Sequence, residues 1–120
     1  MERILIIEDD TNIRKLLRVN LMARGFKVLE AEEGRQGLDI LRNASPSILL
    51  LDIKLPDISG WDLLKIMASD HSYPHIPVIV ITASLNSIKP EHDFYDELRK
   101  VLVKPLNIQE LTDEIKKALV

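Results

Sequence analysis

The chain of 120 residues contains no cysteine, few aromatic residues and no long apolar run. Without cysteine it cannot form a disulfide, supply a thiolate nucleophile or bind a metal through sulfur. Apolar runs such as residues 4–7 are far shorter than the roughly 20 residues that span a bilayer. Acidic residues follow that first run directly, unlike the pattern of a signal peptide. We therefore expect a cytoplasmic protein.

The chain also has little excess charge. Its net charge of −3 gives no electrostatic basis for binding nucleic acid or an anionic membrane, so we expect neither as a partner. The apolar content of 46% and the charged content of 29% are typical of a globular protein. A chain of this length can bury roughly two-thirds of its unfolded surface. We expect residues 1–120 to form one domain, without a linker or repeat.

Short apolar runs alternate with segments of helical periodicity along the whole chain. The runs predict strands at residues 4–7, 26–31, 48–52, 78–82 and 101–103. Predicted helices begin near Asp10 or Thr11, Gly34, Gly60, Pro90 and Asn107. The first has Leu16 and Leu17 on its buried face and Gly25 just past its end, and the fourth extends to Arg99. Five strand–helix pairs predict a flavodoxin-like α/β sandwich of three layers, with a parallel sheet of order 2-1-3-4-5 and helices on both faces.

Polar residues stand where four of these strands end. Glu8 and Asp9 follow the first strand, Asp52 ends the third, Thr82 ends the fourth and Lys104 follows the fifth. Parallel strands lie about 4.8 Å apart with their carboxyl ends at one edge of the sheet, so these side chains should meet in one pocket. Each residue alone has an ordinary explanation, such as an acid that caps a helix. Their convergence on one edge favours a functional site.

The expected pocket holds three carboxylates, one hydroxyl and one ammonium group. Clustered carboxylates repel one another, and a hard divalent cation such as Mg²⁺ offsets that repulsion best. An aspartate beside Mg²⁺ can act as a nucleophile toward phosphorus and form an acyl phosphate. Such a transfer mainly needs positioning and charge neutralisation, which Lys104 and the Thr82 hydroxyl can supply. His71, His75 and His92 have no metal-ligand spacing, and we interpret them as solvated loop residues; Trp61 is interpreted as a packing residue.

Four segments of the chain resemble the receiver domain of two-component response regulators. They read ILIIEDD at residues 4–10, LLDIKLPDISG at residues 50–60, VITA at residues 80–83 and VKP at residues 103–105. In this order they form a highly specific signature that covers essentially the whole chain. The resemblance implies a phosphorylation-dependent signalling switch of a phosphorelay, not a turnover enzyme.

The resemblance also implies a role for each site residue. Asp52 would be the phosphoacceptor, and Thr82 and Lys104 would contact the phosphoryl group. The Mg²⁺ site would comprise Asp52, Asp9, the backbone carbonyl of Lys54, and Glu8 acting through water. The Lys104–Pro105 bond would be cis. The phosphodonor would be a sensor histidine kinase or a histidine phosphotransfer protein, and a downstream protein or an output domain would read the change.

Two features depart from the family pattern. The aromatic residue that usually stands three positions before the lysine is replaced by Val101, which leaves Tyr95 or Phe94 as substitutes. Residues 95–100 lack the family's usual Gly-Ala-Asp-Asp-Tyr pattern, so the dimer of transcription-factor receivers is not expected. Lys54 and Ser84 occupy positions that flank the phosphoryl group in the family, and we expect the Lys54 ammonium to lengthen the phosphoryl lifetime.

The sequence is also compatible with several alternative functions. The chain is either a stand-alone receiver or the receiver of a longer DNA-binding or enzymatic regulator, and a receiver that is not phosphorylated would also share the fold. A flavodoxin-like electron carrier needs a phosphate-binding loop after the first strand, where residues 8–10 are acidic. A haloacid-dehalogenase-type phosphatase needs a second aspartate where Lys54 stands. A Rossmann dehydrogenase needs a glycine-rich motif that is missing.

Overall fold

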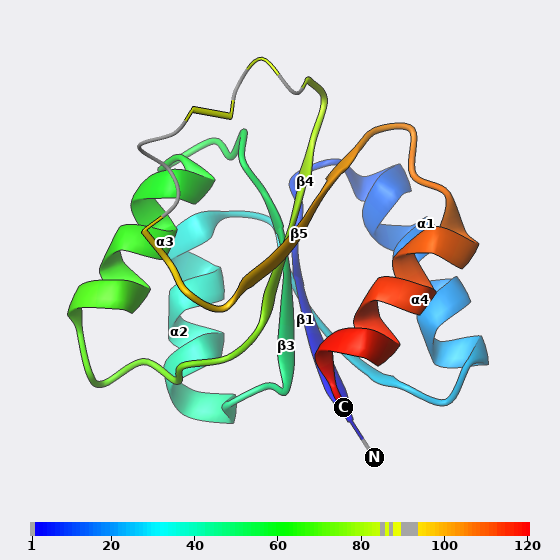
Figure 1. The fold of residues 1–120 in the computed structure, drawn as a ribbon, viewed down its shortest axis with the longest axis horizontal. Helices are drawn as coiled ribbons and strands as arrows, with labels where there is room; N and C mark the ends of the chain where they lie inside the picture. The colour runs from blue at the N-terminus through cyan, green and yellow to red at the C-terminus, as the bar shows by residue number, and fades with distance from the viewer. Residues whose placement is uncertain (1, 85, 87, 90–93) are drawn as a thin grey trace.

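The computed structural model describes residues 2–84, 86, 88–89 and 94–120, which form three layers with a parallel sheet in the middle (Figure 1). The strands are β1 (Arg3–Ile7), β2 (Lys27–Ala31), β3 (Ile48–Asp52), β4 (Val78–Thr82) and β5 (Leu98–Val103). The helices in the described residues are α1 (Thr11–Ala23), α2 (Gly34–Ala44), α3 (Gly60–Ser69) and α4 (Ile108–Ala118). Helices α2 and α3 cover one face of the sheet, and α1 and α4 cover the other.

The sheet has the order β2-β1-β3-β4-β5, and all four strand pairings are parallel. Both the order and the two-sided helix cover confirm the flavodoxin-like fold expected from the sequence. The two chain termini lie together at the end where β1 begins (Figure 1). The carboxyl ends of β1, β3 and β4 therefore lie at the opposite end of the molecule.

Uninterrupted apolar runs form the central strands because successive side chains enter different cores. In β1, Leu5 and Ile7 pack toward α2 and α3, whereas Ile4 and Ile6 pack toward α1 and α4. Residues of β3 and β4 alternate in the same way between the two cores. Every residue of β3 and β4 is buried, as is typical of parallel strands covered on both faces. This rigid centre fixes where the residues at the strand ends lie.

Local sequence signals define the helix ends. The Asp10 carboxylate accepts hydrogen bonds from the N–H groups of Asn12 and Ile13, and Asn107 caps α4 through the N–H of Glu110. Gly25 has a φ of +91° just after α1, where a left-handed residue ends a helix without strain. These three positions agree with the sequence prediction. The prediction that Leu16 lies on the buried face of α1 is wrong, because Leu16 is 49% exposed, whereas Arg14 is buried.

The helix predicted from Pro90 to Arg99 is not supported where the structure describes it. Residues 90–93 lie outside the described residues, residues 94–97 are not helical, and β5 already begins at Leu98. The predicted strand at residues 101–103 is therefore longer by three residues. A register shift lets β5 extend, because Val78 pairs with Leu98 and Ile79 pairs with Lys100, which leaves Arg99 as an extra residue.

Burial of Tyr95 explains why the chain takes an extended path here. Its side chain is only 1% exposed, and its hydroxyl donates a hydrogen bond of 2.8 Å to the carbonyl of Ile76. This hydrogen bond links the segment before β5, at Tyr95, to the segment before β4, at Ile76. A helix that ran to Arg99 could not place Tyr95 there and also start the strand at Leu98. Among the residues that the structure describes, no helix combines the length and apolar character needed to cross a bilayer.

Candidate functional site

The fold brings the polar residues of the strand ends together at one edge of the sheet. Glu8 and Asp9 follow β1, Asp52 ends β3, Thr82 ends β4 and Lys104 follows β5. All but Glu8 line one cleft of about 810 Å³, and Glu8 lies fully buried beneath it. The loop between β3 and α3 forms a large part of the wall, with residues 53–59 all lining the cleft.

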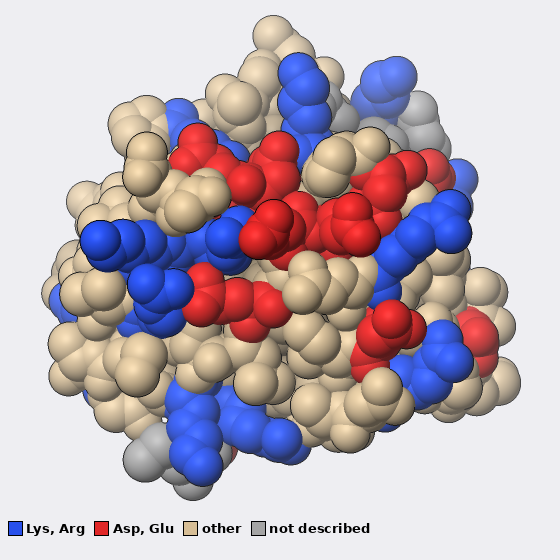
Figure 2. Space-filling view, turned by 180° about the vertical axis from the view of Figure 1, so that it is seen from behind, with Lys and Arg blue, Asp and Glu red and all other residues tan. Residues whose placement is uncertain are grey.

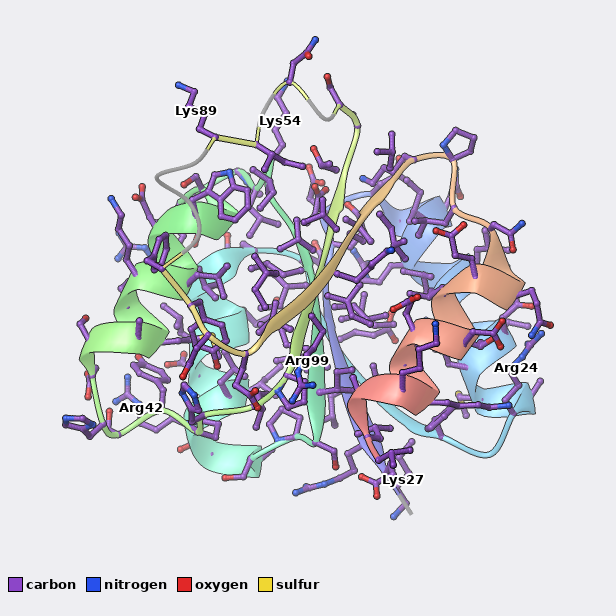
Figure 3. The ribbon with its side chains drawn as sticks, viewed as in Figure 1. Arg24, Lys27, Arg42, Lys54, Lys89 and Arg99 are labelled. Atoms are coloured by element: carbon purple, nitrogen blue, oxygen red, sulfur yellow. The ribbon has the colours of Figure 1, made fainter. Side chains whose placement is uncertain are left out.

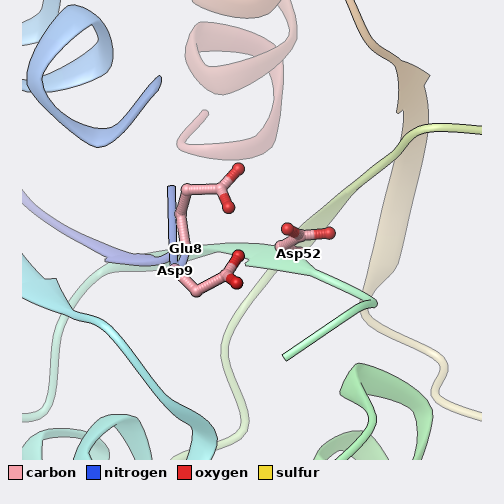
Figure 4. Close-up of side chains that lie close together, drawn as sticks. All are labelled: Glu8, Asp9 and Asp52. Atoms are coloured by element: carbon pink, nitrogen blue, oxygen red, sulfur yellow. The ribbon is translucent and has the colours of Figure 1, made fainter. Parts of the chain in front are cut away.

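Three carboxylates form the core of the site. One oxygen each from Glu8, Asp9 and Asp52 lies within 4.8 Å of the others, and Figure 4 shows their side chains reaching into a common space. Asp52 and Glu8 are buried, whereas Asp9 is exposed to the cleft. Three hard oxygen donors at this spacing fit Mg²⁺, which binds few protein carboxylates and keeps several waters. The donor set is therefore suited to the ion that the sequence predicts.

Lys104 supplies the cation that balances two of these carboxylates. Its Nζ lies 2.7 Å from Oε1 of Glu8 and 3.1 Å from Oδ2 of Asp52. Burial alone would lower the pKa of Lys104, but its hydrogen bonds to Glu8 and Asp52 outweigh burial and raise that pKa. Lys104 is therefore charged at neutral pH. The Lys104–Pro105 bond is cis, as the sequence resemblance implies.

Glu8 is the most perturbed acid of the site. Burial and the neighbouring Asp52 raise its pKa from 4.5 to about 7, although the hydrogen bond from Lys104 opposes the shift. Lys104 cannot neutralise every carboxylate, because Glu8, Asp9 and Asp52 carry three negative charges when all are ionised. Near neutral pH a proton on Glu8 removes part of this excess. A divalent cation at the same place would displace that proton.

Thr82 and Lys54 line the same cleft as Asp52. The buried Thr82 hydroxyl donates to the carbonyl of Ser84 at 3.1 Å. The Lys54 N–H donates to Oδ1 of Asp52 at 3.2 Å, which holds the start of the β3–α3 loop against the carboxylate. The Lys54 side chain is exposed and lies at the end of the molecule where β3 and β4 end (Figure 3). All residues predicted for the site from the sequence thus line or adjoin one cleft.

Arg14 was not predicted to be near the site. It is buried on α1, and its guanidinium donates to the carbonyl of Glu8 at 2.8 Å and to Oε1 of Glu30 at 3.2 Å. It therefore fixes the backbone at the acidic turn from beneath. The signal available in the sequence was weak, because an arginine four residues after a capping aspartate usually points to solvent.

The remaining predicted residues lie away from the cleft. His71 is exposed, Nε2 of His75 lies 2.8 Å from Oδ1 of the exposed Asp96, and His92 lies outside the described residues. Trp61 is 7% exposed within the core, which confirms its packing role. Tyr95 is bound to Ile76, before the start of β4, whereas Thr82 lies at the other end of that strand. Tyr95 therefore does not stand beside Thr82 in place of the family's aromatic residue.

Comparison with known proteins gives a consistent result. The family model described as the response regulator receiver domain matches residues 4–116. The chain is 30% identical over 116 residues to the polar-differentiation response regulator DivK of Brucella ovis, covering 97% of this chain and 94% of that protein. A receiver domain protein from Methanospirillum hungatei has a TM-score of 0.86 at 30% identity, with 99% of this chain and 94% of that chain covered.

A second solved structure bears on the metal. The response regulator TrrA from Thermotoga maritima, crystallised in complex with Mg²⁺-BeF, has a TM-score of 0.87 at 28% identity, with 99% of this chain and 100% of that chain covered. The family match spans nearly the whole sequence, and the sheet order and the acidic cleft agree with it. The chain therefore belongs to the response regulator receiver domain family.

Proposed function

We propose that this chain is a single receiver domain in which Asp52 accepts a phosphoryl group from a phosphohistidine. The convergence of Asp52 with two further carboxylates and with Lys104 in one open cleft carries this proposal. A carboxylate nucleophile, a fixed cation and a cluster of hard oxygen donors are the parts that phosphoryl transfer requires. The magnesium complex of the TrrA relative supports the same chemistry.

In the proposed reaction, an oxygen of Asp52 attacks the phosphorus of the donor. A P–O bond forms while the P–N bond breaks, and the electron pair of the broken bond returns to the imidazole. Asp9, Asp52, the Lys54 carbonyl and, through water, Glu8 would hold Mg²⁺. The bound ion would neutralise charge on the phosphoryl oxygens.

The other residues of the chain act on the phosphoryl group by charge and hydrogen bonding. Lys104 Nζ lies 3.1 Å from Asp52 and can follow the negative charge as it moves onto the phosphoryl oxygens. The Thr82 hydroxyl can exchange its bond with the Ser84 carbonyl for one with a phosphoryl oxygen. Such an exchange would change the conformation of the loop after β4, and a protein partner or an output domain could recognise the new conformation.

In this proposal the chain is a cytoplasmic switch. It promotes its own phosphorylation and the slow hydrolysis of the phosphorylated aspartate, and it does not turn over a separate substrate. Its partners would be a sensor histidine kinase or histidine phosphotransfer protein and a downstream reader, with no direct role for nucleic acid or membrane. The match to the receiver domain family supports this choice of partners.

Intact-mass measurement tests the proposal directly. Incubation with acetyl phosphate and Mg²⁺ should add the mass of one PO₃ group to the parent protein and none to Asp52→Ala. Asp62→Ala is the matched control, because Asp62 is an exposed carboxylate on the first turn of α3. The proposal fails if the parent gains no mass, or if Asp52→Ala gains as much as the parent.

A further inference from the structure

An aspartate of the β3–α3 loop caps a helix that lies 23 residues earlier in the chain. Glu33 is the N-cap residue of α2, but its side chain makes no capping hydrogen bond. The Asp57 carboxylate takes this place: Oδ1 accepts from the N–H of Gly34 and Oδ2 from the N–H of Arg35, each at 2.8 Å. The first turn of α2 therefore binds the loop that forms the cleft wall.

The contact is tight as well as polar. A Cβ atom added to Gly34 would lie 2.5 Å from Cγ1 of Ile58, so any larger residue there would force the Ile58 side chain to shift. The Asp57 side chain is only 16% exposed. Burial alone would raise its pKa, but the hydrogen bonds from Arg35 and Gly34 lower it overall, so Asp57 is a carboxylate at neutral pH. The positive end of the helix dipole favours the same charge.

The loop is also fastened near its two ends. The N–H of Lys54 donates to Asp52 at 3.2 Å, and the N–H of Gly60 donates to the carbonyl of Ile53 at 2.8 Å. Between these bonds, residues 54–59 line the cleft. The Asp57 contact holds the middle of this segment against α2, and α2 itself packs on β1 and β2.

We propose that Asp57 is a positioning residue, which holds the β3–α3 loop against α2 so that the loop backbone presents the Lys54 carbonyl to the cleft. This inference rests on the proposed function, in which that carbonyl is a magnesium ligand. Asp57 touches neither the metal nor the phosphoryl group. It acts through the backbone that lies between positions 54 and 57, and both of its carboxylate oxygens are needed.

The test compares Mg²⁺ binding by isothermal titration calorimetry in the parent and in Asp57→Asn. Asparagine keeps the size of the side chain but can accept only one of the two N–H bonds. We expect the dissociation constant to rise about tenfold, as when a residue that orients a metal ligand is lost. The rate of phosphorylation by acetyl phosphate at limiting Mg²⁺ should fall by a similar factor and recover at saturating Mg²⁺.

Asp70→Ala is the control for a purely structural effect. Oδ1 of Asp70 accepts hydrogen bonds from the N–H and the hydroxyl of Ser72, after the far end of α3, and alanine removes both bonds. Asp70→Ala should lower stability without changing the dissociation constant for Mg²⁺. If Asp57→Asn does not fold, Gly34→Ala provides the second test, because its methyl group would lie 2.5 Å from Cγ1 of Ile58 and 3.3 Å from Oδ1 of Asp57 and so disturb the contact between the loop and α2. It too should weaken Mg²⁺ binding.

The outcomes separate this inference from the proposed function. If the parent binds Mg²⁺ and accepts phosphate while Asp57→Asn or Gly34→Ala binds Mg²⁺ equally tightly, the positioning role is wrong and the proposed function stands. Equal weakening by Asp70→Ala would also overturn the positioning role. If the parent neither binds Mg²⁺ nor gains phosphate, the proposed function fails, and the inference fails with it.

Discussion

At the scale of single residues, the site is defined by an imbalance of charge. Lys104 is shared between Glu8 and Asp52, whereas Asp9 beside them forms no ion pair with any residue that the structure describes. A buried cluster with surplus negative charge is costly, so it favours any cation that enters the cleft. The surplus is therefore useful for binding, although it lowers the stability of the metal-free protein.

Lys54 provides a prediction at the same scale. Its side chain is exposed on the cleft wall two residues after Asp52, where an ammonium group can shield a phosphoryl group from attacking water. If this contact is worth about 1 kcal/mol, Lys54→Ala should shorten the half-life of the phosphorylated protein by about fivefold. The measurement is the decay of the phosphorylated mass after the small-molecule donor is removed. Lys65→Ala, on the exposed side of α3, is the control, and an unchanged half-life in Lys54→Ala would refute the shielding role.

At the scale of whole elements, periodicity predicted the sheet and most helices correctly. Residues 48–52 and 78–82 form strands because their apolar runs face helices on both sides, and the helix from Gly60 to Ser69 has the predicted bounds. The predicted site followed from the same logic, since a parallel sheet places strand ends at one edge. Here a strong pattern and the tertiary structure agree.

Prediction failed where tertiary contacts outweigh local pattern. The burial of Arg14 depends on Glu30 and on the carbonyl of Glu8, which lie on other elements, so helical periodicity could not reveal it. The longer β5 depends on the register shift at Val78 and on the burial of Tyr95. The cap that Asp57 provides joins positions 22 and 23 residues apart, beyond any local capping signal.

The hydrogen bond from Tyr95, just before β5, to Ile76 leads to a prediction about stability. The hydroxyl bond to Ile76 is part-buried, and burial raises the pKa of Tyr95 to about 12, so the group stays a neutral donor. Tyr95→Phe should lower the free energy of unfolding by about 1 kcal/mol, because the Ile76 carbonyl loses a partner. Urea denaturation measures this loss. Phosphorylation by acetyl phosphate should stay unchanged, since Tyr95 does not line the cleft. A large loss of phosphorylation would show that Tyr95 is coupled to the site.

At the scale of the whole molecule, acidic and basic side chains are unevenly distributed. Figure 2 shows Asp and Glu side chains gathered across one face, with Lys and Arg side chains along its borders. Ion pairs of Glu30 with Arg14 at 3.2 Å and with Arg18 at 3.0 Å balance part of this charge. The cleft carboxylates are balanced less completely, so a divalent cation should stabilise the entire fold.

The effect of Mg²⁺ on unfolding should depend on pH, and Glu8 fixes the sign. Because its folded pKa is raised from 4.5 to about 7, the metal-free folded protein holds more protons than the unfolded chain between these values. The contribution of Glu8 to the stability of the metal-free protein is therefore largest below pH 4.5. This contribution is lost as the pH rises through about 7, and the loss amounts to at most about 3 kcal/mol. Mg²⁺ needs the ionised carboxylates, so it should restore stability most where that loss is complete.

Thermal unfolding at pH 6 and pH 8, with and without millimolar Mg²⁺, checks this expectation. Mg²⁺ should raise the Tm at both values, because it binds the native cluster and hardly the unfolded chain, and the rise should be larger at pH 8. Each kcal/mol of added stability corresponds to about 4 °C. Asp9→Asn should remove most of the rise, because it deletes a carboxylate that is exposed to the cleft and that we propose as a metal ligand. A Tm that Mg²⁺ leaves unmoved at pH 8 would contradict the proposed metal site, whereas an equal rise at both pH values would contradict only the competition between the metal and the Glu8 proton.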